Sequence, residues 1–288
     1  LAHSRPARLR GRVGIWTACV MRIVIRTRFQ MERGCFGFCL PRDSTTYLPI
    51  SKGDQDAATS DTMDGGMSAR VLVIGASGGI GAALSEALRA RGSSVTPLSR
   101  AGEGLDLMDE ASVNAALEGL TGPFDAVIVA TGALEIDGAA PEKSLHAITQ
   151  KAMLDQFALN AVGPALVLRH AARLLPRDRR AVFAVLSARV GSIGDNRLGG
   201  WISYRSAKAA VNQIVHTAAI ELTRSHKNSI CVALHPGTVK TAFTAKYLAR
   251  HPAVAPSEAA ENLLAVIDGL TPADTGQFFD WAGKPEPW

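Results

Sequence analysis

Short apolar runs alternate with helical patterns from Met67 to the end of the chain, and this alternation restricts the possible folds more than any other feature. Such alternation indicates βαβ units and a parallel sheet. Most of the runs are continuously apolar, as expected when helices cover both faces of a sheet. The predicted strands are Val71–Ile74, Ser94–Leu98, Ala126–Ala130, Ala181–Leu186, Ile230–Leu234 and a short one at Gln277–Asp280. The predicted helices are Gly79–Arg91, Glu110–Leu120, Lys151–Leu175, Tyr204–Ser225 and Ser257–Leu270.

The first 66 residues differ in composition from the rest of the chain. They show no sustained periodicity, and they end in a polar stretch from Ser51 to Gly66. An Arg-rich leader of this kind suits a transit peptide, whereas a simpler interpretation places the true start at Met67 and makes the preceding residues a start-site artefact. We therefore predict a basic, disordered or artefactual extension and linker over residues 1–66, followed by one α/β domain over residues 67–288.

Charge and cysteine content exclude several classes of protein. The net charge is +5, but residues 1–66 hold ten Lys and Arg against six Asp and Glu, which leaves +1 for the domain. A nearly neutral domain does not suggest a nucleic-acid partner. Only Cys231 of the four cysteines lies in the domain, which favours a reducing, cytoplasmic location over a disulfide framework. We expect no metal site and, because the apolar stretch Val13–Ile25 contains Arg22 and is short, no membrane partner.

A glycine-rich loop directly follows the first predicted strand and opens the first predicted helix. Glycines in this loop allow a tight turn, and the free N–H groups of a helix N-terminus can hold a pyrophosphate. A glycine loop alone is weak evidence, because any sharp turn from strand to helix favours glycine. The candidate dinucleotide-binding residues here are Gly75, Ser77, Gly79, Ile80 and Gly81.

The end of the second predicted strand indicates which dinucleotide is bound. Ser99 and Arg100 stand where an acidic residue would accept hydrogen bonds from the adenosine ribose. A guanidinium group suits a 2′-phosphate instead, so NADP(H) is the preferred cofactor and NAD(H) remains possible. The alternative interpretation of Arg100 is a solvated surface side chain.

Tyr204 and Lys208 are the central candidates for chemistry. Their i, i+4 spacing places both side chains on one face of a helix, one turn apart. A free phenol titrates at about 10, too high for efficient proton transfer near neutral pH. A neighbouring ammonium group and a positively charged nicotinamide would lower the pKa of Tyr204, which could then act as a general acid and base.

Taken together, these motifs make residues 70–288 resemble the short-chain dehydrogenase/reductase family. The resemblance implies a single Rossmann domain that interconverts a small carbonyl compound and a secondary alcohol. It also implies a homodimer or homotetramer formed through the helices predicted at Lys151–Leu175 and Tyr204–Ser225. The matching residues beyond the glycine loop are Asp106 and Leu107 at the adenine edge, Gly132, Asn160, Tyr204, Lys208 and the segment from Pro236 and Gly237 to Thr241.

The resemblance also assigns roles to individual residues. It implies that Asn160 fixes a water that connects Lys208 to a proton relay, and that Lys208 also holds the nicotinamide ribose. Val239 and Thr241 correspond to residues that contact the carboxamide. The residues from Gly194 to Trp201 lengthen one loop, and with the chain ending they resemble the subgroup of C-factor and sniffer-type carbonyl reductases.

Two departures from the family pattern affect the expected chemistry. Thr131-Gly132 stands in a motif that normally contains asparagines, and this change is structural rather than catalytic. Ala188 occupies the position of the catalytic serine, and losing a donor to the reacting oxygen costs on the order of 10²-fold in rate. Either Ser187 or Ser192 substitutes for it, or the activity is weak. The alternative function is therefore a dinucleotide-binding signalling or regulatory protein of the C-factor type with little turnover.

Overall fold

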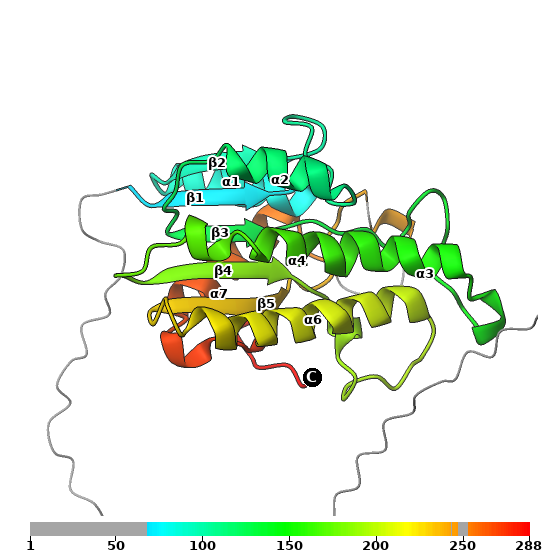
Figure 1. Ribbon diagram of the computed structural model, residues 1–288. Helices are drawn as coiled ribbons and strands as arrows, with labels where there is room; N and C mark the ends of the chain where they lie inside the picture. The colour runs from blue at the N-terminus through cyan, green and yellow to red at the C-terminus, as the bar shows by residue number, and fades with distance from the viewer. Residues whose placement is uncertain (1–67, 243, 247–252) are drawn as a thin grey trace, which may run out of the picture. The chain divides into compact units, whose positions relative to one another are not determined.

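The computed structural model describes residues 68–242, 244–246 and 253–288, which form a parallel sheet with helices on both faces (Figure 1). The sheet has six strands in the order β2-β1-β3-β4-β5-β6. The strands are β1 (Arg70–Ile74), β2 (Ser94–Leu98), β3 (Ala126–Val129), β4 (Ala181–Leu186), β5 (Ser229–His235) and β6 (Phe278–Asp280). The extension predicted over residues 1–66 lies outside the described residues.

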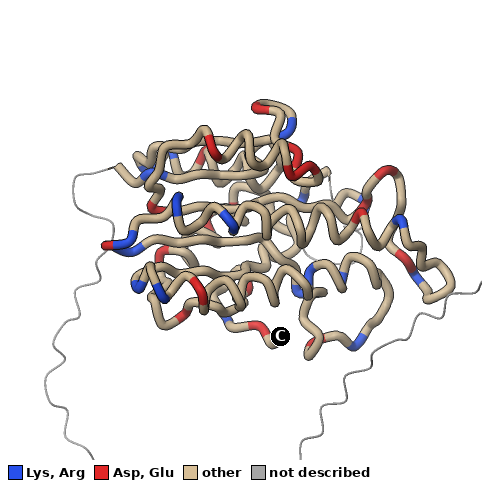
Figure 2. The backbone as a smooth tube through the Cα atoms, in the orientation of Figure 1, with Lys and Arg blue, Asp and Glu red and all other residues tan. Residues whose placement is uncertain are grey.

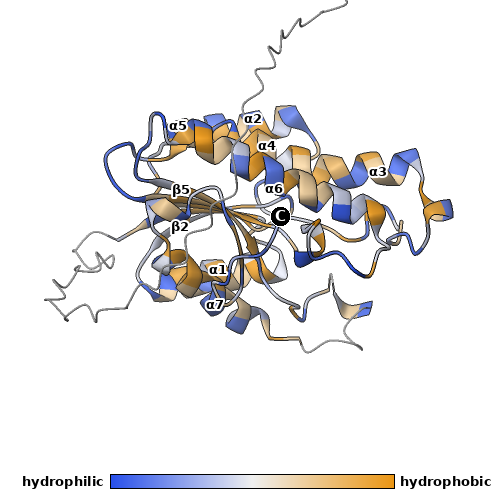
Figure 3. Ribbon diagram, turned by 90° about the horizontal axis from the view of Figure 1, so that it is seen from below, coloured by the Kyte–Doolittle hydropathy of each residue, from blue (hydrophilic) through white to orange (hydrophobic). Residues whose placement is uncertain are grey.

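Two layers of helices cover the sheet, and Figure 3 shows them on opposite sides. One layer consists of α1 (Gly79–Ala90) and α7 (Pro256–Gly269), and the other contains α2 (Glu110–Glu118), α4 (Gly163–Leu168), α5 (Ala171–Leu174) and α6 (Ile202–Leu222). Neighbouring strand residues point to opposite layers. Val73 packs in the core beneath α1 and α7, whereas Leu72 packs in the core beneath α2 and α6. This arrangement is the predicted doubly wound Rossmann fold.

The strand register brings several loops to the same edge of the sheet. Ile74 of β1 pairs with Leu98 of β2 on one side and with Val129 of β3 on the other. The chain therefore leaves all three strands at the same level, where the order of connection reverses. Ligands of open α/β sheets bind at this switch point.

All six predicted strands are confirmed to within one residue at each end, and the segment predicted at Lys151–Leu175 is helical over most of its length but is not one regular α-helix. The segment divides into α3 (Gln150–Phe157), a π-helical turn (Ala158–Val162), α4 and α5. Pro164 lacks the N–H group that would continue the helix, and a Cβ atom on Gly163 would lie 2.8 Å from Cβ of Leu107. Short 3-10 turns also occur at Leu145–Ala147, Arg189–Gly191 and Pro272–Asp274.

Charged residues of both signs are interspersed along the described chain, as Figure 2 shows. None of the described helices is both long enough and apolar enough to cross a bilayer. No cluster of three or more His, Cys, Asp or Glu side chains in residues 68–242, 244–246 and 253–288 could hold a metal ion.

The turn between β1 and α1 depends on two glycines. Gly75 has a φ angle of +88°, and its N–H donates to the carbonyl oxygen of Leu98 at 2.8 Å. A Cβ atom on Gly81 would lie only 2.1 Å from the Gly75 carbonyl oxygen. The helix can therefore approach the preceding turn this closely only because residue 81 has no side chain.

We predict that Gly81→Ala lowers the free energy of unfolding by about 2–3 kcal/mol, because the added methyl group must displace backbone atoms. Gly269→Ala is the control, since a Cβ atom there meets nothing within 4 Å and φ lies outside the positive range. Chemical denaturation should find the control within about 0.5 kcal/mol of the parent protein. Equal effects of the two substitutions would contradict this account of the turn.

Candidate active site

Tyr204 and Lys208 lie together at the start of α6, and both are buried. Their exposed fractions are 7% and 2%. The Lys208 Nζ atom donates to the carbonyl oxygen of Leu186, the last residue of β4, at 2.9 Å. The same nitrogen lies 5.9 Å from the centre of the Tyr204 ring. The spacing in the sequence thus corresponds to a pair of neighbouring side chains at the carboxyl edge of the sheet.

Burial shifts the pKa values of both groups toward their neutral forms. It lowers the pKa of Lys208 to about 8, and it raises the pKa of Tyr204 above its usual range. Desolvation is the dominant effect on the pKa of the phenol in the protein alone, and the lowering expected from Lys208 together with a nicotinamide charge stays a prediction. A lower value requires positive charge beyond what the buried lysine supplies.

Asn160 joins the π-helical turn to the loop that follows β3. Its Oδ1 atom accepts from the Ala133 N–H at 3.2 Å, and its Nδ2 atom donates to the Ala133 carbonyl at 3.0 Å and to Gln156 Oε1 at 2.7 Å. Gln156 in turn donates to the Leu134 carbonyl at 3.0 Å. The two amide side chains therefore hold this loop against the helical segment. Gln156 was not predicted, although it lies one turn before Asn160 on the same helical face.

Gly132 lies between Asn160 and Lys208. A Cβ atom on Gly132 would be 2.9 Å from Asn160 Oδ1 and 3.3 Å from Lys208 Nζ. This close approach explains why glycine is required in the loop. Four of the predicted site residues thus lie close together in the fold: Gly132, Asn160, Tyr204 and Lys208.

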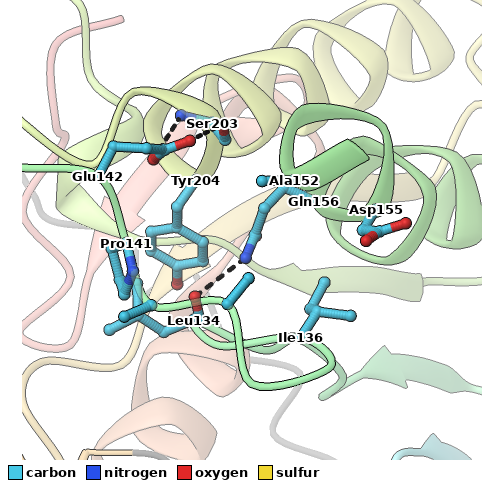
Figure 4. A pocket seen from close by; sticks show the side chains of 11 residues that line it. Leu134, Ile136, Pro141, Glu142, Ala152, Asp155, Gln156, Ser203 and Tyr204 are labelled. Carbon is cyan, nitrogen blue, oxygen red and sulfur yellow. Dashed lines mark hydrogen bonds between the residues drawn. The ribbon is translucent and has the colours of Figure 1, made fainter. Parts of the chain in front are cut away.

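A pocket lies beside Tyr204, and most of its lining is apolar. Figure 4 shows the Tyr204 ring between Pro141 on one side and Gln156 on the other. The dashed line from Gln156 ends on the Leu134 carbonyl oxygen, so this amide is already bonded within the protein. Leu134 and Ile136 contribute further apolar surface. The surface next to the phenol is therefore mostly apolar, and the space that it encloses, about 10 Å³, is no larger than a water molecule needs.

Glu142 is a second residue that the sequence did not indicate. It is 6% exposed, and its carboxylate accepts hydrogen bonds from the hydroxyl and, at 3.3 Å, from the N–H of Ser203. The Trp201 N–H donates to the Glu142 carbonyl at 2.6 Å. A negative charge stabilises a helix N-terminus, so Glu142 fixes the first turn of α6, which carries Tyr204. The partners are 61 residues apart in the sequence, which hides them from pattern analysis.

The two serines proposed as replacements for the residue at Ala188 do not line this pocket. Ser187 donates its hydroxyl to Asn212 Oδ1 at 2.6 Å. The Ser192 hydroxyl accepts from the Asp195 N–H at 3.0 Å. Both serines are buried, so their hydroxyl groups serve internal contacts of this loop. The structure therefore brings Tyr204, Lys208 and Asn160 together, whereas the hydroxyl groups of the two serines are bonded to Asn212 and to the Asp195 N–H.

The glycine turn fits the phosphates of a dinucleotide. Ser77 is exposed, Ile80 is half-buried, and no acidic side chain lies in the first turn of α1. A Cβ atom on Gly79 would lie 2.6 Å from Thr241 Cγ2, so the segment after β5 packs against this turn. The Oγ1 atom of Thr131 is buried beside the turn and has no partner among the described residues. These groups form a cradle with free donors at the switch point.

The remaining predicted cofactor residues lie on both sides of this cradle. Ser99 is buried and Arg100 is exposed, without an ion pair in the described part of the chain. Asp106 Oδ1 accepts from the Met108 N–H at 2.9 Å, and Leu107 is buried against Gly163. Asp106 and Leu107 therefore stabilise the turn that precedes α2.

The segment after β5 is less completely described than the glycine turn. Pro236 is half-buried, Gly237 has a φ angle of +75°, and Val239 is buried. Burial lowers the pKa of the neighbouring His235 to about 4, and its Nδ1 atom is buried without a hydrogen-bond partner among the described residues. Residues 243 and 247–252 of this segment lie outside the described residues.

Comparisons with known proteins agree with this geometry. The family model described as short chain dehydrogenase matches residues 102–251, just over half of the chain. The 1-hydroxy-2-glutathionyl-2-methyl-3-butene dehydrogenase of a Rhodococcus species is 32% identical over 72% of this chain and 94% of its own length. The C-signal protein of Myxococcus xanthus is 33% identical over 58% of this chain and 95% of its own.

Solved structures share the fold at lower identity. The NADPH-bound carbonyl reductase from chicken fatty liver has a TM-score of 0.65 at 23% identity and covers 81% of this chain and 100% of its own. The carbonyl reductase Sniffer of D. melanogaster has a TM-score of 0.63 at 22% identity and covers 77% of this chain and 100% of its own. The Rossmann architecture is therefore common to all three proteins.

The buried Lys208 predicts a specific dependence of stability on pH. Below pH 8 Lys208 is protonated in both the folded and the unfolded chain, so the cost of burying its charge lowers the free energy of unfolding in full. Between pH 8 and 10.5, the usual pKa of a lysine, the unfolded chain binds more protons than the folded chain, so the free energy of unfolding rises with pH. Lys208→Met has no charge to bury, so it should gain most over the parent protein at pH 7. The difference in the free energy of unfolding between the variant and the parent protein should shrink by up to about 3 kcal/mol between pH 7 and pH 10.

Chemical denaturation at a series of pH values measures this difference. Lys227→Met replaces an exposed lysine and is the control, for which we expect no such trend. A difference between Lys208→Met and the parent protein that stays constant from pH 7 to pH 10 would contradict the burial of a charge at this position.

Proposed function

The chain belongs to the short-chain dehydrogenase family, and we propose that this oxidoreductase uses NADP(H) to interconvert a small carbonyl compound and the corresponding secondary alcohol. The observation that carries the proposal is the pair Tyr204 and Lys208, one turn apart in α6, beside an apolar pocket. The glycine turn between β1 and α1 lies at the same edge of the sheet.

Each residue of the site has a defined part in the proposed reaction. A nicotinamide dinucleotide bound along the cradle supplies or accepts the hydride. Tyr204 gives its hydroxyl proton to the carbonyl oxygen during reduction and removes the proton from the alcohol during oxidation. Lys208 supplies positive charge beside the phenol and helps to hold the ribose. Asn160 keeps the loop at Gly132 and the proton path in position through its contacts with Ala133.

The preference for NADP(H) rests on Ser99 and Arg100. Arg100 is exposed and has no ion pair within the described residues, so its guanidinium group is available to a phosphate. The chicken carbonyl reductase of the same fold was solved with NADPH bound, which supports the proposal. NAD(H) remains an alternative cofactor.

The pocket suggests the class of substrate. Its surface beside Tyr204 includes Leu134, Ile136 and Pro141, and we propose that an apolar group attached to the carbonyl carbon packs against these side chains after substrate widens the pocket. Two relatives of this fold are named carbonyl reductases, and one relative by sequence is a dehydrogenase of a glutathione conjugate. We therefore propose aldehydes, ketones and quinones as the first compounds to screen.

One observation favours a second candidate function. Ala188 offers no donor, Ser187 is bonded to Asn212, and the C-signal protein is a relative at 33% identity. A dinucleotide-binding signalling protein with little turnover would need the cradle but not a complete set of catalytic donors. Cofactor binding without turnover of any carbonyl compound would favour this alternative.

We predict that Tyr204→Phe abolishes turnover and leaves the affinity for NADPH nearly unchanged, because only the proton-donating hydroxyl is lost. Lys208→Ala should lower both turnover and affinity, since the lysine serves the phenol and the ribose. Steady-state kinetics with the best substrate of the screen and fluorescence titration with NADPH measure the two effects. Full activity of Tyr204→Phe against every active substrate would overturn the reductase proposal.

The two serines provide matched controls for this experiment. Ser187→Ala and Ser192→Ala remove hydroxyl groups that are buried in internal contacts outside the described pocket lining, so each should retain turnover within about tenfold. A loss of roughly 10²-fold in one variant would identify that serine as the missing donor. That result would require its loop to rearrange when substrate binds.

We also propose a homodimer or homotetramer formed through the helices around α3, α4 and α6. The apolar residues Leu154, Val162 and Ile220 are 60%, 48% and 54% exposed on these segments, whereas Val211 is fully buried. Light scattering should return at least twice the chain mass, and Ile220→Glu should reduce it because a charge would enter the contact. A monomeric parent protein would contradict the proposal.

A further inference from the structure

The turn after β2 contains an acidic side chain that folds back onto Ser99. One carboxylate oxygen of Glu103 accepts a hydrogen bond from the Ser99 N–H at 2.8 Å and another from the Ser99 hydroxyl at 3.1 Å. Figure 2 shows the loop above β2 and α2 carrying both basic and acidic positions. An acid therefore lies at the end of β2, although none follows this strand directly in the sequence.

The two groups that Glu103 engages are donors that a phosphate could also use. A backbone N–H and a serine hydroxyl next to an arginine form a typical phosphate-binding set. A carboxylate on the same donors excludes a second anion, both by occupying them and by like-charge repulsion. A ribose hydroxyl is different, because it can donate a hydrogen bond to the carboxylate.

We infer that Glu103 limits the preference of this protein for NADP(H) by competing with the 2′-phosphate for Ser99. The inference rests on the proposed function and extends it. In NAD(H) the free ribose hydroxyl meets Glu103 as an acceptor. In NADP(H) the phosphate must displace the carboxylate before it reaches Ser99, while Arg100 attracts it. The two side chains thus act in opposite directions on the same subsite.

The turn does not depend on the carboxylate for its shape. The Glu103 N–H and the Leu105 N–H both donate to the Ser99 carbonyl at 3.1 Å. The Gly102 N–H donates to the Ser99 hydroxyl oxygen at 3.0 Å. Three hydrogen bonds therefore hold the turn when the side chain of residue 103 is changed. This makes release of the carboxylate by a bound phosphate feasible and makes substitution at this position a fair test.

The experiment uses two adenosine ligands that carry no nicotinamide, so it does not depend on turnover. Adenosine 2′,5′-bisphosphate and adenosine 5′-phosphate differ only in the 2′-phosphate, and calorimetric titration gives the ratio of their affinities. We expect Glu103→Gln and Glu103→Ala to raise the bisphosphate-to-monophosphate affinity ratio by about tenfold. Glutamine keeps an acceptor for Ser99 and removes only the charge, which guards against loss of the turn.

Glu118→Gln is the matched control, because it removes the same charge from an exposed position at the far end of α2. Its affinity ratio should equal that of the parent protein. The inference is overturned if both Glu103 variants keep the parental ratio, or if Glu118→Gln changes the ratio equally. If neither adenosine ligand and neither NADPH nor NADH binds the parent protein, the proposed function itself fails and takes this inference with it.

Discussion

The register of the parallel sheet determines which parts of the chain can meet. Parallel strands direct all their carboxyl ends to one edge, and here β1, β2 and β3 end at the same level. Consequently, the segments that follow these strands start next to one another: the glycine turn after β1, Ser99 after β2 and the loop with Gly132 after β3. The same edge receives Leu186 at the end of β4, whose carbonyl oxygen binds Lys208. A shift of one residue in any strand would turn its core side chains to the other layer and separate these contacts.

Burial of the Lys208 ammonium group is the main electrostatic cost within this arrangement. Its Nζ atom has the Leu186 carbonyl as a partner and lies next to Gly132 and the Tyr204 ring. None of these neighbours carries a negative charge, so desolvation lowers the pKa to about 8. The ammonium group therefore remains largely protonated at neutral pH and is poorly compensated by the protein. Such a group favours any ligand that supplies acceptor oxygens beside it, as ribose hydroxyls do.

The sequence was sufficient to predict every strand and most of the helices, because these depend on local periodicity. It also indicated Tyr204 and Lys208 through their local spacing, and Asn160 through the resemblance to the family. The π-helical turn around Asn160 was not predicted, although Pro164, which lacks an N–H group, is a local signal of a change in the helix. Glu142 was missed because its partner lies on a distant segment. Long-range pairs of this type leave no periodic signal in one sequence.

The site differs from the family pattern in having few hydroxyl groups available to a carbonyl oxygen. Ser203 also lines the described pocket, but its hydroxyl is bonded to Glu142, and the Gln156 amide is bonded to Leu134. In the proposed reaction, Tyr204 must therefore both orient the carbonyl and donate the proton. The apolar lining then has to supply the rest of the orientation through contact surface. Since dispersion contacts fix position less sharply than a directed hydrogen bond, this geometry favours compounds whose carbonyl group is intrinsically reactive over those that need strong polarisation.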